Sequence, residues 1–541
     1  MDRFQALGYS ILLWAWWVGL FGGAYRACLF AAPFLLFVPV DLYLLTVYHA
    51  KLTPTIFGII SESDPAEATQ FLNGLWLPAA SAYLFVLATA GASLWLLRHG
   101  NLVWRHRSRI WVLLLVPSIV GVLHLITEHQ EAWARDLKPF PNPFRVAPMP
   151  AAIENLRDTF PFGLILQFVD YVDGSRKLAL MRDALAHFRF GAAQAASYDG
   201  RQAFVLVIGE SARADRWSVN GYTRSTSPRL ARERNLITLT NAVSVAPMTR
   251  LSVPVILTRK PGKDATQPAF PERSLVSAFS EAGFSTYWMS TQSPLGLHDS
   301  PSSMYAKESS HVTYFNLTGA WNETPQDTVM LPYLKEVLSG PEQRQLIVMH
   351  TLGSHYDYRY RYTEEFDLFK PSPTRDEPLS LHDAASKEKL NNAYDNSILY
   401  TDYFLDEVIV AIRASGRPLA AVIYVSDHGE DLFDQGCENS GHGRSTRATY
   451  RIPFFFWYSD EYAKRFPTKV SVLKQRRKEP ITTEAVFPTL VDAADIRFAG
   501  EDLSRSLFSP RFERHPRIVT GFWGNLDYDH AHLNDQCELV N

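Results

Sequence analysis

The sequence predicts an α-helical transmembrane domain followed by an α/β domain with a mainly parallel sheet and helices on both faces. Two observations support this prediction. Four apolar runs of nearly membrane-spanning length lie within the first quarter of the 541 residues. From Arg201 onward, short apolar runs alternate with helix-like stretches, which is typical of a parallel sheet covered by helices.

The four apolar runs continue past any point where a signal peptide could be cleaved, and four of them are hard to place in a soluble core. Each is about long enough to cross a bilayer as a helix. They comprise residues 7–24, 28–49, 74–97 and 109–127. We therefore expect a transmembrane domain of about four spans at residues 1–127. The side of the membrane on which the N-terminus lies depends on whether the short first run crosses the bilayer.

Basic residues orient the predicted spans. Four arginines gather between the third and fourth runs: Arg98, Arg105, Arg107 and Arg109. Their loop is expected to be cytoplasmic, because positive charge accumulates on that side. The loop 50–73 has one lysine against three acidic residues and is expected outside, as is the chain after residue 128.

Residues 128–200 are expected to link the membrane domain to the soluble domain. Five prolines between residues 139 and 150 break regular structure there. Lys177–Phe190 carries apolar residues at helical spacing with basic residues between them. This pattern predicts an amphipathic helix resting on the bilayer surface, and a helix docked on the soluble domain fits it equally well.

Residues 201–541 form the predicted α/β domain. Its strand-like runs are 204–208, 236–239, 285–289, 345–349, 420–425 and 452–457, and its clearest helix-like stretches are 273–282, 328–338 and 386–414. The segment 356–381 is dense in tyrosine, arginine and acidic residues. Because it follows His355 directly, we expect it to form a loop over the functional site.

Composition narrows the possible functions. A net charge of −3 argues against a nucleic-acid partner. With three cysteines, Cys28, Cys437 and Cys537, a site of four thiolates is impossible. Any metal must therefore be held by His, Asp, Glu or hydroxyl ligands.

Metal-type ligands follow two of the predicted strands. Glu210 comes directly after the strand that ends at Gly209, and Asp427 and His428 follow the strand 420–425. In open α/β sheets, the chemistry lies just beyond the carboxyl ends of the strands. Two carboxylates and an imidazole suit zinc with an open fourth position. Glu210 alone could equally be an acid that caps a helix.

Thr249 is the candidate for the open position. A hydroxyl on a cation loses its proton more easily and becomes a nucleophile. On the residues alone, a helix N-cap is the more ordinary role for this threonine. His350, His355 and the glycine-flanked His442 lie at or near predicted strand ends, and together they favour a site over isolated surface imidazoles.

The motifs GESARADRWSVNGY, MTRLSVP, HTLGSH, SDHGE and GHG follow in this order behind a membrane segment. This arrangement resembles the phosphoethanolamine transferases of Gram-negative envelopes, which belong to the alkaline phosphatase and sulfatase superfamily. The resemblance covers nearly the whole chain and implies an alkaline-phosphatase-like soluble domain in the periplasm of an inner-membrane protein. It also implies zinc ligands at Glu210, Thr249, Asp427 and His428.

In that family the threonine carries phosphoethanolamine as a covalent intermediate, which makes Thr249 the expected nucleophile. His355 and His442 match family histidines that assist the phosphate. Ser63 and Glu67 match polar residues that face the donor lipid. The implied activity transfers phosphoethanolamine from phosphatidylethanolamine to an envelope acceptor such as lipopolysaccharide, at lipid A or the core.

The sequence also departs from the family. A cysteine pair brackets the nucleophile in the lipid A enzymes, whereas Val245 and Val255 stand here. The usual asparagine near the lipid-facing residues is absent, and four spans are expected instead of five. These differences indicate a cysteine-poor, divergent branch whose acceptor is open, as is the number of metal ions.

Three alternative functions remain at this stage. A phosphoglycerol transferase would share the threonine and the topology. A phosphodiesterase or sulfatase-type hydrolase would share the SDHGE motif, although a sulfatase needs a Cys or Ser nucleophile. A non-catalytic membrane scaffold would need none of these ligands.

A periplasmic location bears on Cys437 and Cys537, because disulfides persist in oxidising compartments. Cys437 lies between the SDHGE motif and His442, and a bond to Cys537 would tie the following tail to the loop that carries His442. We expect this bond, with two free thiols as the alternative.

Overall fold

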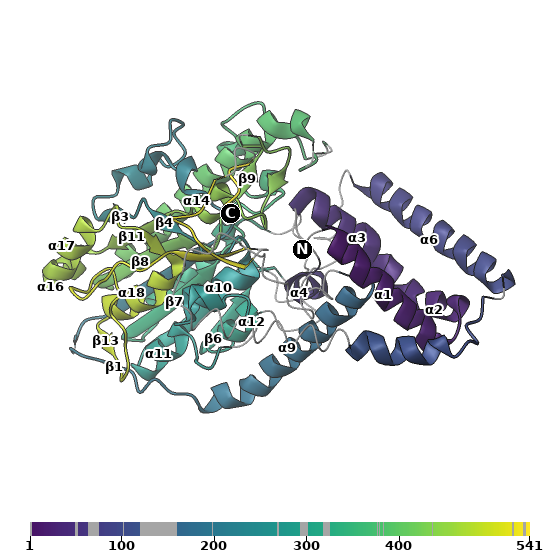
Figure 1. The fold of residues 1–541 in the computed structure, drawn as a ribbon. Helices are drawn as coiled ribbons and strands as arrows, with labels where there is room; N and C mark the ends of the chain where they lie inside the picture. The colour runs from purple at the N-terminus through teal and green to yellow at the C-terminus, as the bar shows by residue number, and fades with distance from the viewer. Residues whose placement is uncertain are drawn as a thin grey trace, which may run out of the picture. The chain divides into compact units, whose positions relative to one another are not determined.

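The computed structural model describes residues 3–48, 52, 54–62, 75–100, 102–118, 159–196, 198–267, 270–292, 301–316, 325–375, 377, 379–381, 383–434, 436–521, 524–533 and 537–540. The chain divides into two compact units. One comprises residues 1–58 and 75–173, and the other comprises residues 59–74 and 174–541. Figure 1 shows the elements of both units.

The first unit consists of apolar helices. They are α1 Arg3–Phe21, α2 Ala24–Ala31, a 3₁₀ segment Ala32–Phe37, α3 Val38–Tyr43, a π-helical turn Leu44–Tyr48, α4 Pro54–Glu62, which runs into the second unit, and α6 Trp76–His99. Pro33 and Pro39 begin the 3₁₀ segment and α3, where a missing N–H is tolerated.

Two helical stretches are long and apolar enough to cross a membrane: Ala24–Thr46 and Trp76–His99. They correspond to the second and third predicted spans. The first predicted run lies mostly within α1 and has a shorter apolar stretch, Ser10–Phe21, and the fourth is described only over Ser108–Ser118. Among the described residues, two of the four expected spans are therefore candidates by length and composition, and the transmembrane domain of about four spans stays a prediction.

Helix α9 spans Phe162–His187. Directly after it, Phe190 is 6% exposed and packs in the core of the second unit, where Arg259 lies 5.7 Å from its ring centroid. The chain directly after α9 is therefore part of this core, whereas neither interpretation of the predicted helix over Lys177–Phe190 is tested. The side chains of residues 177–184 lie outside the description.

A seven-stranded sheet forms the centre of the second unit, in the order β3-β11-β8-β2-β7-β5-β6. The strands are β2 Gln202–Gly209, β3 Leu236–Thr238, β5 Ser285–Ser290, β6 His311–Tyr314, β7 Arg344–His350, β8 Leu419–Ser426 and β11 Phe454–Tyr458. Neighbours from β8 to β6 are parallel, and β11 is antiparallel to both β8 and β3. The predicted, mainly parallel sheet is thus confirmed, with β6 as an additional strand.

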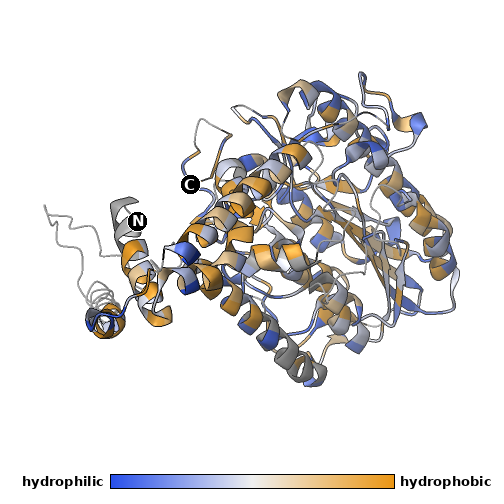
Figure 2. Ribbon diagram, turned by 90° about the vertical axis from the view of Figure 1, so that its right-hand side faces the viewer, coloured by the Kyte–Doolittle hydropathy of each residue, from blue (hydrophilic) through white to orange (hydrophobic). Residues whose placement is uncertain are grey.

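Alternate residues of β2 enter two separate cores because successive side chains of a strand point to opposite faces. Phe204, Leu206 and Ile208 pack with α10 Thr249–Leu257, α11 Leu275–Glu281 and α18 Val486–Ala493. Val205 and Val207 pack with α13 Met330–Ser339 and α14 Lys387–Ala414. Helices therefore cover both faces, and Figure 2 shows apolar residues both along the central strands and on the helices.

Smaller elements surround the sheet. They are α12 Pro301–Ala306, α15 Arg447–Tyr450, α16 Asp460–Arg465, α17 Pro467–Gln475, and the pairs β1 Ala193–Gln194 with β13 Ile496–Arg497, β4 Ala242–Val243 with β12 Ile481–Thr482, β9 Asp431–Leu432 with β10 Ser440–Gly441, and β14 Ile518–Gly521 with β15 Gly524–Asp527.

Candidate active site

The register of the two central strands brings the predicted ligands together. Gly209, the last residue of β2, pairs with Ser426, the last residue of β8. Glu210 and Asp427 therefore leave the sheet side by side. Glu210 is 1% exposed, and Asp427 and His428 are fully buried.

The ligand atoms of these three residues lie within 4.8 Å of one another. His428 Nε2 is 3.2 Å from Glu210 Oε1 and 3.4 Å from Asp427 Oδ2. Thr249 Oγ1 lies 3.1 Å from Glu210 Oε2 and 3.2 Å from His428 Nε2. All four predicted ligands thus converge on one point.

Thr249 is the first residue of α10, and Met248 occupies the N-cap position. No side chain caps this helix, so the N-cap interpretation of Thr249 is wrong. Its hydroxyl instead faces the carboxylate of Glu210. Glu210 is likewise no helix cap, since its side chain accepts hydrogen bonds from the side chains of Ser211, Thr249 and Gln292.

Several features of the four residues fit a zinc ion. His428 Nδ1 donates to the carbonyl of Gly429 at 2.9 Å, so Nε2, once it has lost its proton, would present its lone pair to an ion among the other ligands. Asp427 Oδ2 is buried without a hydrogen-bond partner among the described residues. Two carboxylates, an imidazole and a hydroxyl are ligand types that zinc accepts.

The electrostatic environment of these residues also favours a bound cation. Burial, together with the neighbouring Glu210 carboxylate, raises the pKa of Asp427 to about 7. Burial would lower the pKa of His428, but the carboxylates of Asp427 and Glu210 outweigh it and raise that pKa to about 10. Two buried carboxylates at this distance repel each other, and a divalent cation would remove that cost.

His442 and His355 flank the ligand set. The His442 ring centroid lies 4.5 Å from that of His428 and 5.5 Å from that of His355. Burial lowers the pKa of His355 to about 4, so its imidazole is neutral at neutral pH. His350, the third histidine singled out by the sequence, packs edge-on against Trp288 in the sheet and does not join the cluster.

Sequence reasoning assigned no role to Glu430 or Gln292. Glu430 is fully buried, accepts a 2.8 Å hydrogen bond from the Tyr358 hydroxyl and lies 3.1 Å from His442 Nδ1. Gln292 Nε2 donates to Glu210 Oε2 at 3.2 Å and to the carbonyl of Thr351. Glu430 stands in the quoted SDHGE motif, whereas nothing in the sequence around Gln292 marks it.

The segment 356–381 lies against the site, as expected. Besides the Tyr358 contact, the carbonyl of Leu381 accepts from the N–H of Ser440, two residues before His442. Ser63 and Glu67, the expected donor-lipid residues, lie outside the residues that the structure describes. Val245 and Val255 are fully buried in an apolar cluster around the start of α10.

Cys437 and Cys537 form a disulfide with a Cα–Cα distance of 4.6 Å, which confirms the predicted bond. The tail that follows pairs with the chain after His442. Arg447 N donates to Glu538 O, and Val540 N donates to Ser445 O. The loop of His442 is therefore fastened to the tail on both sides of the histidine.

Several known proteins are similar to this chain. A family model described as Sulfatase matches residues 202–496. The phosphoethanolamine transferase EptC of Escherichia coli K12 is 30% identical over 346 residues, which is 61% of this chain and 58% of EptC. The Kdo(2)-lipid A phosphoethanolamine 7''-transferase of the same strain is 28% identical over 282 residues, covering 51% of this chain and 47% of that enzyme. The chain thus aligns with about half the length of these relatives.

Two solved structures are similar. The zinc complex of the C-terminal periplasmic domain of E. coli EptC has a TM-score of 0.57 at 27% identity and covers 64% of this chain and 98% of that domain. The integral membrane protein EptA of Neisseria meningitidis has a TM-score of 0.64 at 19% identity over 91% and 87% of the two chains, which shows a shared fold. These matches confirm the resemblance to the phosphoethanolamine transferases. The chain belongs to the sulfatase family.

Proposed function

We propose that this protein transfers phosphoethanolamine from phosphatidylethanolamine, through a covalent intermediate on Thr249, to an envelope acceptor such as lipid A or the core of lipopolysaccharide. One observation carries the proposal. The Thr249 hydroxyl lies at the start of α10, within hydrogen-bonding distance of Glu210 and His428, among buried ligands that suit zinc. The relatives named above support the choice of reaction.

Glu210, Thr249, Asp427 and His428 would hold the zinc ion. When bound, zinc lowers the pKa of a coordinated hydroxyl and stabilises charge on phosphoryl oxygens. A phosphate or a second ion would lie on the side of His355 and His442.

The reaction proceeds in two displacements. Thr249 Oγ1 forms a bond to phosphorus while the bond from phosphorus to the glycerol oxygen breaks, and diacylglycerol leaves with a proton. An acceptor oxygen then attacks the same phosphorus, Thr249 is released, and the acceptor proton returns to the threonine. His442 is suited to move these protons through Nε2, because Nδ1 is engaged by Glu430.

We further propose a multi-pass inner-membrane protein with its catalytic domain in the periplasm. Two apolar helices of spanning length and a disulfide typical of an oxidising compartment support this location. The proposed domains are 1–127, transmembrane; 128–200, linker; and 201–541, catalytic. Ser63 and Glu67 would face the donor lipid.

The test is purified protein in liposomes that contain phosphatidylethanolamine labelled in the head group. Intact mass should show one phosphoethanolamine added to the wild type and none added to Thr249→Ala. Ser252→Ala, which removes a buried hydroxyl one turn along α10, is the matched control and should keep the adduct. An adduct formed from labelled phosphatidylglycerol instead would indicate a phosphoglycerol transferase, and label released only to water would indicate a hydrolase.

A further inference from the structure

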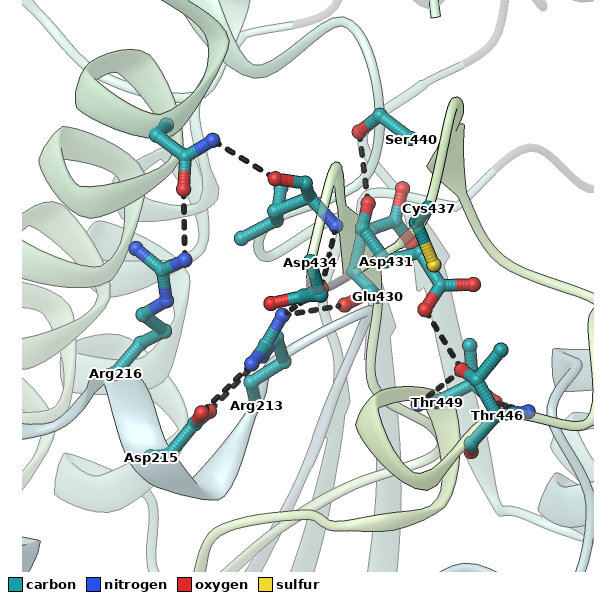
Figure 3. Close-up of polar contacts among 12 residues, drawn as sticks. Arg213, Asp215, Arg216, Glu430, Asp431, Asp434, Cys437, Ser440, Thr446 and Thr449 are labelled. Carbon is teal, nitrogen blue, oxygen red and sulfur yellow. Dashed lines mark hydrogen bonds and ion pairs between the residues drawn. The ribbon is translucent and has the colours of Figure 1, made fainter. Parts of the chain in front are cut away.

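Arg213 connects the two strand ends of the site without belonging to the ligand set. It lies three residues after Glu210 and is 6% exposed. Nε and Nη2 donate to Asp215 at 2.9 and 2.6 Å, whereas Nη1 donates to Asp434 Oδ2 at 2.6 Å and to the carbonyl of Glu430 at 3.2 Å. Figure 3 shows the guanidinium between the two carboxylates. One side chain therefore ties the turn after β2 to the chain after β8.

The chain held by Arg213 leads to His442. We call residues 430–442 the His442 loop; it contains the β9–β10 hairpin. At its start, the backbone of Glu430 is fixed by Arg213, and the side chain of Glu430 contacts His442 Nδ1. Just after its end, Gly443 N donates to the carbonyl of Pro247, two residues before Thr249.

We propose that Arg213 is a positioning residue of the transfer reaction, which holds the His442 loop against the turn of Glu210 and so fixes His442 beside the ligand set. This role rests on the proposed function. It extends that function because the guanidinium touches neither the ligand atoms nor, in the proposed reaction, the phosphorus.

The geometry requires arginine. A planar guanidinium can serve two carboxylates and a carbonyl at once, whereas a lysine ammonium is a single point that cannot reach all three in this arrangement. Arg213→Lys keeps the buried charge and one carboxylate partner. It should therefore loosen the His442 loop more than it weakens the fold.

Arg417 provides the matched control. It is also buried, at 2% exposure, but donates to the carbonyls of Leu338, Gly340 and Glu342 at the opposite end of the sheet, before β8 begins. Arg417→Lys should cost a comparable amount of stability without touching the His442 loop.

The first experiment compares amide hydrogen exchange of the wild type, Arg213→Lys and Arg417→Lys. We expect Arg213→Lys to lose protection selectively in peptides covering residues 430–446, and Arg417→Lys to leave those peptides unchanged. Equal protection of these peptides in all three proteins would overturn the proposal. Because this measurement needs no substrate, it remains decisive even if the wild type proves inactive with phosphatidylethanolamine, a result that would count against the proposed function alone.

The second experiment is a double-mutant cycle with His442→Ala. Arg213→Lys should lower kcat roughly tenfold with little change in KM, as is typical for residues that orient a site, and Arg417→Lys should leave kcat per folded molecule unchanged. In the His442→Ala background, Arg213→Lys should add less than about twofold, because its target is gone. Fully additive losses would show that Arg213 does not act through His442.

Discussion

At the scale of single residues, the reactivity proposed for Thr249 depends on the groups that its hydroxyl faces. A threonine hydroxyl is a poor nucleophile at neutral pH, so its reactivity must come from neighbours. The buried carboxylate of Glu210 and the Nε2 of His428 are those neighbours. The same pair would share a zinc ion with the threonine, so nucleophile and metal ligand are proposed to be one side chain.

Thr249→Ala should reduce phosphoethanolamine transfer by at least ~10³-fold, because the bond-forming oxygen is removed. The free energy of unfolding should change by less than about 1 kcal/mol, since the side chain is only half-buried. Initial rates and thermal unfolding of the two proteins measure both effects. If an adduct persists in Thr249→Ala, Ser211 becomes the next candidate, because its hydroxyl lies 2.8 Å from Glu210 Oε1.

Asp427→Ala should remove zinc and activity together. Asp427 contributes a buried oxygen that no described group hydrogen-bonds, and three remaining ligands would hold zinc more weakly. The measurement is the zinc content of the wild type and of each variant after dialysis against a weak chelator. Asp434→Ala is the control, because it removes a nearby carboxylate outside the ligand set and should keep its zinc. Full zinc occupancy in Asp427→Ala would refute the ligand assignment.

At the scale of elements, α14 anchors the turn after β2 through polar contacts. The Tyr394 hydroxyl donates to the carbonyl of Ser211 and accepts from the N–H of Arg213. Further along the helix, Asp402 accepts from the N–H groups of Arg229 and Leu230. One helix thus fixes the turn of Glu210 and the segment that follows it.

Asp402 should make stability depend on pH. Burial raises its pKa in the folded protein to about 7, against about 3.9 in an unfolded chain. The folded state therefore keeps a proton that the unfolded state loses, and stability falls as the pH rises through the window from about 4 to 7. The contribution lost is up to ~4 kcal/mol.

Chemical unfolding at pH 4 to 8 checks this dependence. Asp402→Asn should flatten the curve, because the variant has no proton to lose at this position. Asp406→Asn, which removes only the partly exposed partner of Arg229, should keep most of the slope. Parallel curves for the wild type and Asp402→Asn would contradict the assignment.

At the scale of the whole molecule, the disulfide closes a loop of 100 residues. Breaking it should cost roughly 2–4 kcal/mol of stability. Activity should fall as well, because the tail holds the chain on both sides of His442. Reductant should lower both the stability and the activity of the wild type. Cys437→Ser should have lower stability and activity than the wild type before reductant is added, and reductant should not change either of them. A wild type that is unaffected by reductant would show that the tail does not support the site.

The sequence predicted six strands of the sheet and placed Glu210, Asp427 and His428 at strand ends, because buried strands and strand-end ligands leave local patterns. The residues alone favoured a helix N-cap for Thr249, and its place among the ligands came from the family resemblance. β6 escaped prediction, since His311–Tyr314 is a short edge strand with exposed and half-buried side chains. The roles of Gln292 and Arg213 were not predicted, for a different reason. Their roles depend on partners that lie about 80 and 220 residues away, respectively, and no local pattern records such distances.

The pairing of residues 538–540 with residues 445–447 also sets an order of events during biosynthesis. The ligands at Glu210, Thr249, Asp427 and His428 are all translated well before Cys537. The His442 loop, however, cannot receive its cross-link, and residues 445–447 after it cannot receive their backbone partners, until residue 540 has been made and has reached the same compartment. The nascent protein would therefore pass through a stage in which the metal ligands are present while the loop of the neighbouring histidine still lacks its disulfide, which residues 537–540 supply later.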